Sequence, residues 1–267
     1  MVTVVLAGIR AELTKIVTLR STWIVTAAVL ALHLLICMAN LRQNTEAVAT
    51  ITPDGLIELF AGQPRPAYQA IVDFLVSSSF QMGLFLSVLA AVLAGQEFRA
   101  HQLGQSVLAV PGRGVLVTTK TVAVAAYLLT VSLVIAAIST AFMYAAVRGW
   151  DPAVVTSGGA LRGQGRFLIF AVLSALVGYA LTLLSRSTLI GIVASVALIA
   201  VTMTQALAGS APALDALFPL SAGRNLLLNP ADSRLTAGPV HALVVLVSWP
   251  SLTTAIAGLL LSRRDAR

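Results

Sequence analysis

The stretch from Thr121 to Val147 reads TVAVAAYLLTVSLVIAAISTAFMYAAV and contains no Asp, Glu, Lys or Arg. The hydrocarbon core of a bilayer is ~30 Å thick, so about 20 helical residues cross it. A helix satisfies all its backbone hydrogen bonds within the segment, which lipid requires of an isolated stretch. These residues therefore predict a membrane-spanning helix.

The composition of the whole chain agrees with that prediction. Of its 267 residues, 58% are hydrophobic and 10% are charged, and the mean hydropathy is +0.94. An ordinary soluble domain has about 45–50% apolar and ~25% charged residues. This composition predicts a polytopic helical membrane protein and excludes disorder, a coiled coil, collagen and a disulfide scaffold. The one cysteine, Cys37, cannot form an intrachain disulfide.

Six stretches have the length and apolar character of spans, and we expect a single all-α domain over residues 1–267. The expected spans are about 22–41, 71–95, 121–147, 167–184, 188–208 and 240–261. Only Ser185, Arg186 and Ser187 separate the fourth from the fifth, which predicts a tight helical hairpin. Residues 40–70 are expected to form a long loop with turns. Residues 209–239 are expected to form a re-entrant or surface-lying helix pair.

The basic residues orient this chain. With six spans both termini lie on one side, and that side holds ten of the 17 Lys and Arg residues. We expect both termini to be cytoplasmic and the protein to lie in the plasma membrane. The net charge of +7 comes from basic residues placed singly, so no run tracks a phosphate backbone and no nucleic-acid partner is expected.

Residues 1–20 predict an amphipathic helix before the first span. Apolar residues recur there at steps of three and four: Val2, Leu6, Ile9, Leu13 and Ile16. Such a helix lies at the membrane surface. We expect its interfacial anchors to be Arg10, Lys15, Arg20 and Trp23. The helix serves either as a simple anchor or as a docking surface for a partner.

The sequence contains no constellation typical of an enzyme. No pair among its three histidines has the spacing of metal ligands, so no metal site is expected. A Walker A loop requires Gly-Lys-Ser/Thr, whereas the two lysines lie in Thr14-Lys15-Ile16 and Thr119-Lys120-Thr121. The chain is therefore expected to have no nucleotide-binding domain and no ATPase activity of its own.

Uncharged polar residues lie inside the spans. We single out Ser78, Gln81, Thr202 and Gln205. Two roles are open to them: they line a translocation path, or they bond neighbouring helices.

The segment between the second and third spans has more pattern than a connector requires. Glu97, Phe98 and Arg99 begin it, apolar residues including Leu103 and Leu108 follow, and Pro111, Gly112 and Arg113 end it before Lys120. The apolar spacing predicts a short amphipathic helix that ends at Pro111-Gly112. Placed between two rigid spans, this helix could transmit a displacement into both.

This pattern resembles the permease subunits of ABC-2-type transporters, whose corresponding loop reads Glu-aromatic-Arg, an apolar helix, Pro-x-Arg and a later Lys. The chain departs from it at His101-Gln102, where the family usually has Gly-Thr. Further likenesses are Gly178-Tyr179-Ala180-Leu181 through Arg186-Ser187, and Pro219 to Gly223.

The resemblance implies a function and a set of partners. Such permeases have six spans, a surface helix and a coupling helix that docks into a separate ATPase subunit, which binds ATP and Mg. They work as homodimers or with a second permease and usually export their cargo. For this chain the apolar spans favour a hydrophobic or amphipathic compound. The implied coupling residues are Glu97, Phe98, Arg99, Leu103, Leu108, Pro111 and Arg113. Alternatively, the charged residues Glu97, Arg99 and Arg113 only hold the loop to headgroups or to each other. The competing function is a membrane scaffold or assembly subunit with no cargo.

Overall fold

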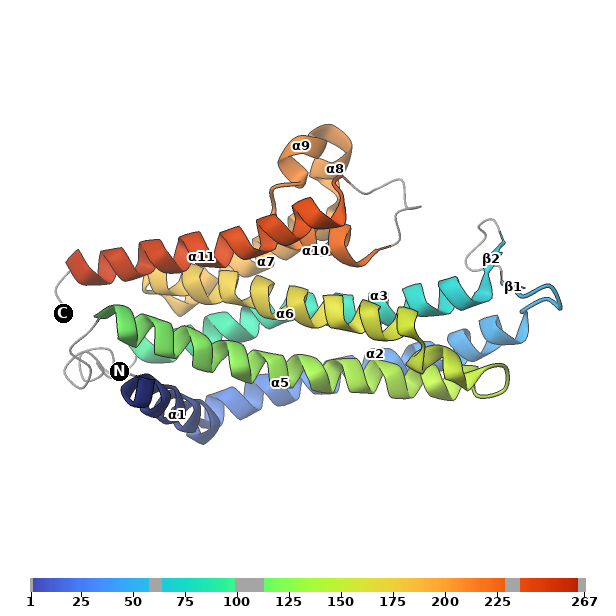
Figure 1. Ribbon diagram of the computed structural model, residues 1–267, viewed down its shortest axis with the longest axis horizontal. Coiled ribbons are helices and arrows are strands. Elements are labelled where there is room, and N and C mark those ends of the chain that lie inside the picture. Colours follow the sequence, from blue (N-terminus) through green and yellow to red (C-terminus); the bar gives the residue numbers. More distant parts are fainter. Residues whose placement is uncertain (1, 58–63, 99–112, 229–235, 264–267) are drawn as a thin grey trace.

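The computed structural model describes residues 2–57, 64–98, 113–228 and 236–263. Long helices lie side by side along one axis (Figure 1). They are α2 (Arg20–Ala49), α3 (Ala67–Gly95), α5 (Arg113–Val147), α6 (Gly158–Ser185), α7 (Thr188–Thr204) and α11 (Pro239–Arg263). The N-terminal helix α1 (Val2–Thr18) lies at the end of the bundle where α11 finishes (Figure 1). We call this the terminal end.

Short elements complete the described chain. The strands β1 (Leu56–Ile57) and β2 (Arg65–Pro66) form an antiparallel pair beyond α2 and α3, at what we call the hairpin end (Figure 1). The 3₁₀ turns are η1 (Gln96–Phe98) and η2 (Pro152–Thr156). Between α7 and α11 lie α8 (Ala206–Ser210), α9 (Pro212–Asp215) and α10 (Pro219–Leu227). Helices α9 and α10 fall within residues 209–239, where a re-entrant or surface-lying helix pair was expected; their position relative to a membrane stays a prediction.

Among the described residues, five helices are long and apolar enough to cross a membrane: Arg20–Ala49, Ala67–Phe98, Gly114–Val147, Gly158–Ser185 and Pro239–Leu259. The chain is thus an all-α protein built for a membrane. The fifth expected span, residues 188–208, instead forms the shorter apolar helix α7 of 17 residues. Its helical path ends because Gln205 takes a left-handed conformation, with φ of 52°.

Several helices begin earlier or end later than their apolar residues indicate. Helix α2 continues to Ala49, where a loop was expected. Five of the eight residues past Leu41 are strong helix formers (Arg, Gln, Glu or Ala), and Arg42 pairs with Glu46 one turn on (2.7 Å). Helix α6 begins at Gly158, with Ser157 Oγ accepting from the Ala160 amide.

The core lies between α3 and α6. In the apolar stretch of each of these helices 67% of the residues are buried, against 17% in that of α2. Phe80 and Phe170 pack there with ring centroids 5.0 Å apart. A Cβ added to Gly178 would lie 2.3 Å from the Ser87 carbonyl oxygen, so only glycine permits this approach of α6 to α3. The outer helices leave large apolar side chains exposed, among them Ile24, Leu35, Leu189, Val193 and Val244. Such a surface suits lipid.

The expected hairpin between residues 184 and 188 is present. Helix α6 ends at Ser185, Arg186 takes a left-handed conformation with φ of 53°, and Ser187 caps α7 by accepting from the Ile190 amide. The turn brings α7 back along α6 (Figure 1).

Candidate functional site

The segment for which a coupling role is predicted begins at η1, which continues α3 after Gly95. Its Glu97 is buried despite carrying a carboxylate, with 8% of the side chain exposed. Phe98 is partly buried and packs against the main apolar core. The first two residues of the predicted motif are therefore fixed to the bundle rather than projecting from it.

Glu97 lies in a cluster of four charged side chains that joins three elements. Its Oε1 accepts from Lys15 Nζ on α1 at 2.5 Å, and its Oε2 accepts from Lys120 Nζ on α5 at 2.8 Å. Lys120 Nζ also donates to Glu12 Oε1 on α1, at 2.7 Å. We call Glu12, Lys15, Glu97 and Lys120 the four-charge cluster. It connects α1, α5 and the end of α3.

Charge balance makes the burial of this cluster tolerable. Two carboxylates face two ammonium groups, and Lys120 is 6% exposed in its side chain. An unpaired buried charge costs several kcal/mol, so each member depends on the others. Glu12 and Lys15 are three residues apart and share one face of α1, which places both on the bundle. Losing one member would leave a partner uncompensated.

The surroundings of the cluster fix α1 closely. A Cβ on Gly8 would lie 3.1 Å from Thr119 Cγ2, so this glycine lets α1 approach α5. The buried Tyr179 of α6 lines the same small cavity as the four charged residues. That cavity has a volume of about 20 Å³, enough for about one water molecule. Its lining comes from α1, α3, η1, α5, α6 and the residue between α1 and α2.

The remaining residues of the predicted coupling segment are only partly visible. Arg99, Leu103, Leu108 and Pro111 lie outside the described residues, and Arg113 is the first residue of α5, with a side chain that is also outside them. Their predicted role stays a prediction.

The predicted interfacial anchors separate into two kinds. Arg10 and Arg20 are exposed, and Trp23 is 56% exposed with its Nε1 donating to the Val17 carbonyl at 2.7 Å. Lys15 instead turns to Glu97 and is half-buried. A lysine expected at the headgroups is thus a member of the four-charge cluster.

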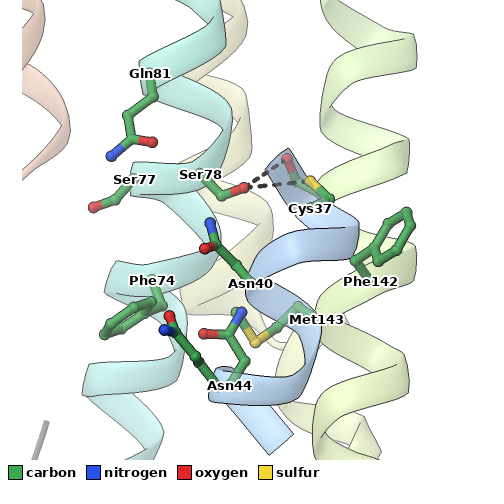
Figure 2. Close-up of a pocket in the computed structure, with 11 residues that line it drawn as sticks. Cys37, Asn40, Asn44, Phe74, Ser77, Ser78, Gln81, Phe142 and Met143 are labelled. Carbon is green, nitrogen blue, oxygen red and sulfur yellow. Dashed lines mark hydrogen bonds between the residues drawn. The ribbon is translucent and has the colours of Figure 1, made fainter. Parts of the chain in front are cut away.

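A second feature is a polar pocket of about 230 Å³ between α2, α3 and α5 (Figure 2). Ser78 and Gln81, two of the predicted path residues, line it. Asn40 lies between the α2 and α3 ribbons, and Ser78 Oγ lies 3.8 Å from Cys37 Sγ (Figure 2). The described lining carries no formal charge; its other members are Gln43, Asn44, Phe74, Ser77, Ser139, Phe142 and Met143. Such a lining suits an uncharged ligand with polar and apolar parts.

The other two predicted path residues lie elsewhere. Thr202 is buried near the end of α7, and Gln205 is the left-handed residue that ends this helix. Neither lines the polar pocket. The structure therefore brings Ser78 and Gln81 together and leaves Thr202 and Gln205 apart from them.

Two buried polar groups lie outside the predicted site residues, and sequence reasoning missed the second of them. Next to the polar pocket, His33 is 1% exposed and its Nε2 lies 3.0 Å from Ser139 Oγ. In the segment before α11, Asp215 pairs with Arg224 and accepts from Ser221 Oγ and Thr236 Oγ1, both at 2.8 Å. The one available signal for the second was an Asp and an Arg nine residues apart in an otherwise apolar segment.

No protein-family model matches the sequence, and the curated proteins include no significant match.

Proposed function

We propose that the chain is the membrane-spanning permease subunit of an ABC exporter, driven by ATP hydrolysis in a separate subunit. The observation that carries the proposal is the position of Glu97. This residue opens the segment with the permease-like pattern, and its two ion pairs tie that segment to Lys15 of α1 and Lys120 of α5. A push on the segment would reach three helices at once.

In this proposal α7 is the sixth crossing. Its 17 residues extend ~26 Å, close to the ~30 Å of the hydrocarbon core. The antiparallel order of the helices then places α1 and the end of α11 on one face, in keeping with their position at the terminal end (Figure 1). That face is cytoplasmic, and the membrane is the plasma membrane.

The polar pocket supplies a segment of the path. Its uncharged amides and hydroxyls, with Phe74 and Phe142 beside them, suit an amphipathic cargo. ATP and Mg belong to the partner subunit. A second permease, identical or different, completes the assembly.

Affinity purification in mild detergent tests the proposal. The wild-type chain is expected to recover an ATPase of the size of an ABC domain. Glu97→Lys places a third ammonium group beside Lys15 and Lys120, and is expected to lose most of this ATPase while still inserting in the membrane. The matched control is Glu46→Lys, which reverses an exposed carboxylate of the Arg42 pair on α2.

Two results would contradict the proposal. One is recovery of the chain alone from several detergents and after crosslinking in intact membranes. The other is equal ATPase recovery with the Glu97 variant and the wild type. The scaffold alternative predicts partners without ATPase activity.

A further inference from the structure

A second pocket, at the side of the bundle toward the hairpin end, is distinct from the polar pocket. It lies between the first turns of α3 and α6 and the end of α10, and its volume is about 430 Å³. Tyr68, Asp73, Gly159, Arg162, Arg166 and Leu227 line it. We call it the arginine pocket.

The arginine pocket sits where α6 changes from polar to apolar. Arg166 directly precedes Phe167, and residues 167–184 contain no charge. In a helix that crosses a bilayer, this boundary lies at the level of the lipid headgroups. The depth of the pocket therefore matches that of a lipid phosphate.

Two arginine side chains line the pocket from one face of α6. Arg162 and Arg166 are four residues apart on α6, so their side chains lie one above the other. Arg162 Nε donates to the Gly158 carbonyl at 3.0 Å, which holds this guanidinium over the first turn of α6. Asp73 is the one acidic residue of the described lining, and its side chain or backbone already interacts with another group of the protein. The described lining thus carries a net charge of +1.

Other groups at the rim also suit an anion. The pocket includes Gly159, in the first turn of the 28-residue helix α6, where the helix dipole is positive. The Tyr68 hydroxyl lies 3.8 Å from the position that a Cβ on Gly159 would take, so it faces the same turn. Planar guanidinium groups bind phosphate oxygens in pairs.

We propose that the arginine pocket binds the phosphate of an anionic phospholipid. The apolar part of its lining favours a lipid over a free anion: Val72 and Val76 of α3 and Leu227 and Leu228 at the end of α10 lie beside the charged groups. An amphiphile places its phosphate between the two arginines and its glycerol and chain against these four residues. The site does not depend on the proposed transport function.

Native mass spectrometry of the full chain tests the site. The detergent-purified protein is offered equal amounts of phosphatidylglycerol and phosphatidylcholine, and inorganic phosphate is offered in a separate arm. The wild type is expected to retain phosphatidylglycerol in preference. Arg162→Gln with Arg166→Gln is expected to reduce that retention by at least about tenfold, because two charge-assisted contacts are lost. Arg162→Lys with Arg166→Lys is expected to retain an intermediate amount.

The control removes the same charge elsewhere. Arg42→Gln with Arg148→Gln deletes two exposed arginines of α2 and of the turn after α5, and is expected to leave lipid retention unchanged. Three outcomes would overturn the proposal: equal loss in both double variants, no preference for phosphatidylglycerol, or binding of inorganic phosphate that displaces the lipid completely. Thermal unfolding of each variant shows whether it is folded. If the Gln double variant is not folded, the comparison of the Lys double variant with the wild type tests the site instead.

Discussion

Lys15 Nζ lies 2.5 Å from Glu97 Oε1, although 82 residues separate them in the chain. The pair connects α1, which lies outside the bundle of long helices, to the 3₁₀ turn η1 that continues α3. Because Glu97 is also bonded to Lys120, a movement of η1 must either carry α1 and α5 with it or break buried ion pairs. Such a joint is stiff, which is what transmission of a displacement requires.

Neutralising Glu97 should destabilise the protein. Glu97→Gln leaves Lys15 and Lys120 facing an amide, and breaking a buried pair costs 3–5 kcal/mol; with Lys15 partly exposed we expect about 2–4 kcal/mol. The melting temperature in one detergent, followed by tryptophan fluorescence, measures the loss. Glu46→Gln, which breaks an exposed pair, should change stability by less than about 1 kcal/mol. Equal shifts for the two variants would show that the cluster is not a stabilising joint.

The two lysines of the cluster should differ in their effect. Lys120 bonds two carboxylates and is 6% exposed in its side chain, whereas Lys15 bonds one and is 25% exposed. Lys120→Met should therefore lower the melting temperature more than Lys15→Met, since it removes the ion-pair partner of Glu12 and leaves Glu97 with Lys15 alone. The opposite order would mean that the α1 contact, not the α5 contact, dominates.

The close approach of α3 and α6 gives a third prediction. Gly178→Ala places a methyl group 2.3 Å from the Ser87 carbonyl oxygen and 2.9 Å from Ser195 Oγ, so the helices must separate. We expect a loss of about 1–3 kcal/mol in thermal or denaturant unfolding. Gly165→Ala, on the same helix with nothing within 4 Å of the new Cβ, should be neutral or slightly stabilising. A harmless Gly178→Ala would contradict this packing.

Accessibility of the polar pocket tests its place in a path and the orientation of the chain. In a Cys37→Ala background, Asn40→Cys should react with a membrane-impermeant maleimide added outside intact cells. Ala175→Cys, in the buried α6 core at 0% exposure, should not react until the protein is denatured. Labelling of Asn40→Cys only after the cells are opened would contradict cytoplasmic termini.

The fold class was predictable because it follows from composition. Charge-free stretches such as residues 121–147 predict spanning helices whatever packs against them. Helix ends were less predictable: α2 continues through Arg42 and Glu46, whose pairing on the helix surface is invisible to hydropathy. The break of α7 at Gln205 was also missed, because a left-handed residue depends on the turn that follows it.

The candidate site was predictable in part. The pattern pointed to Glu97 and Lys120, but not to their pairing with Glu12 and Lys15. Ser78 and Gln81 line one pocket because they are three residues apart on one helix. Thr202 and Gln205 have the same spacing, but whether they reach that pocket depends on where α7 packs in the bundle. Local spacing is readable from the sequence; the position of one helix against another is not.

Site-specific crosslinking tests the central claim, that the segment after Glu97 contacts an ATPase. Leu103→Cys in the Cys37→Ala background is treated in membranes with a cysteine-to-amine crosslinker, and the products are identified by mass spectrometry. We expect a covalent product with an ATPase of the size of an ABC domain, and no such product from Leu35→Cys, whose side chain on α2 is 63% exposed. Products that contain only lipid or a second copy of the chain would contradict it.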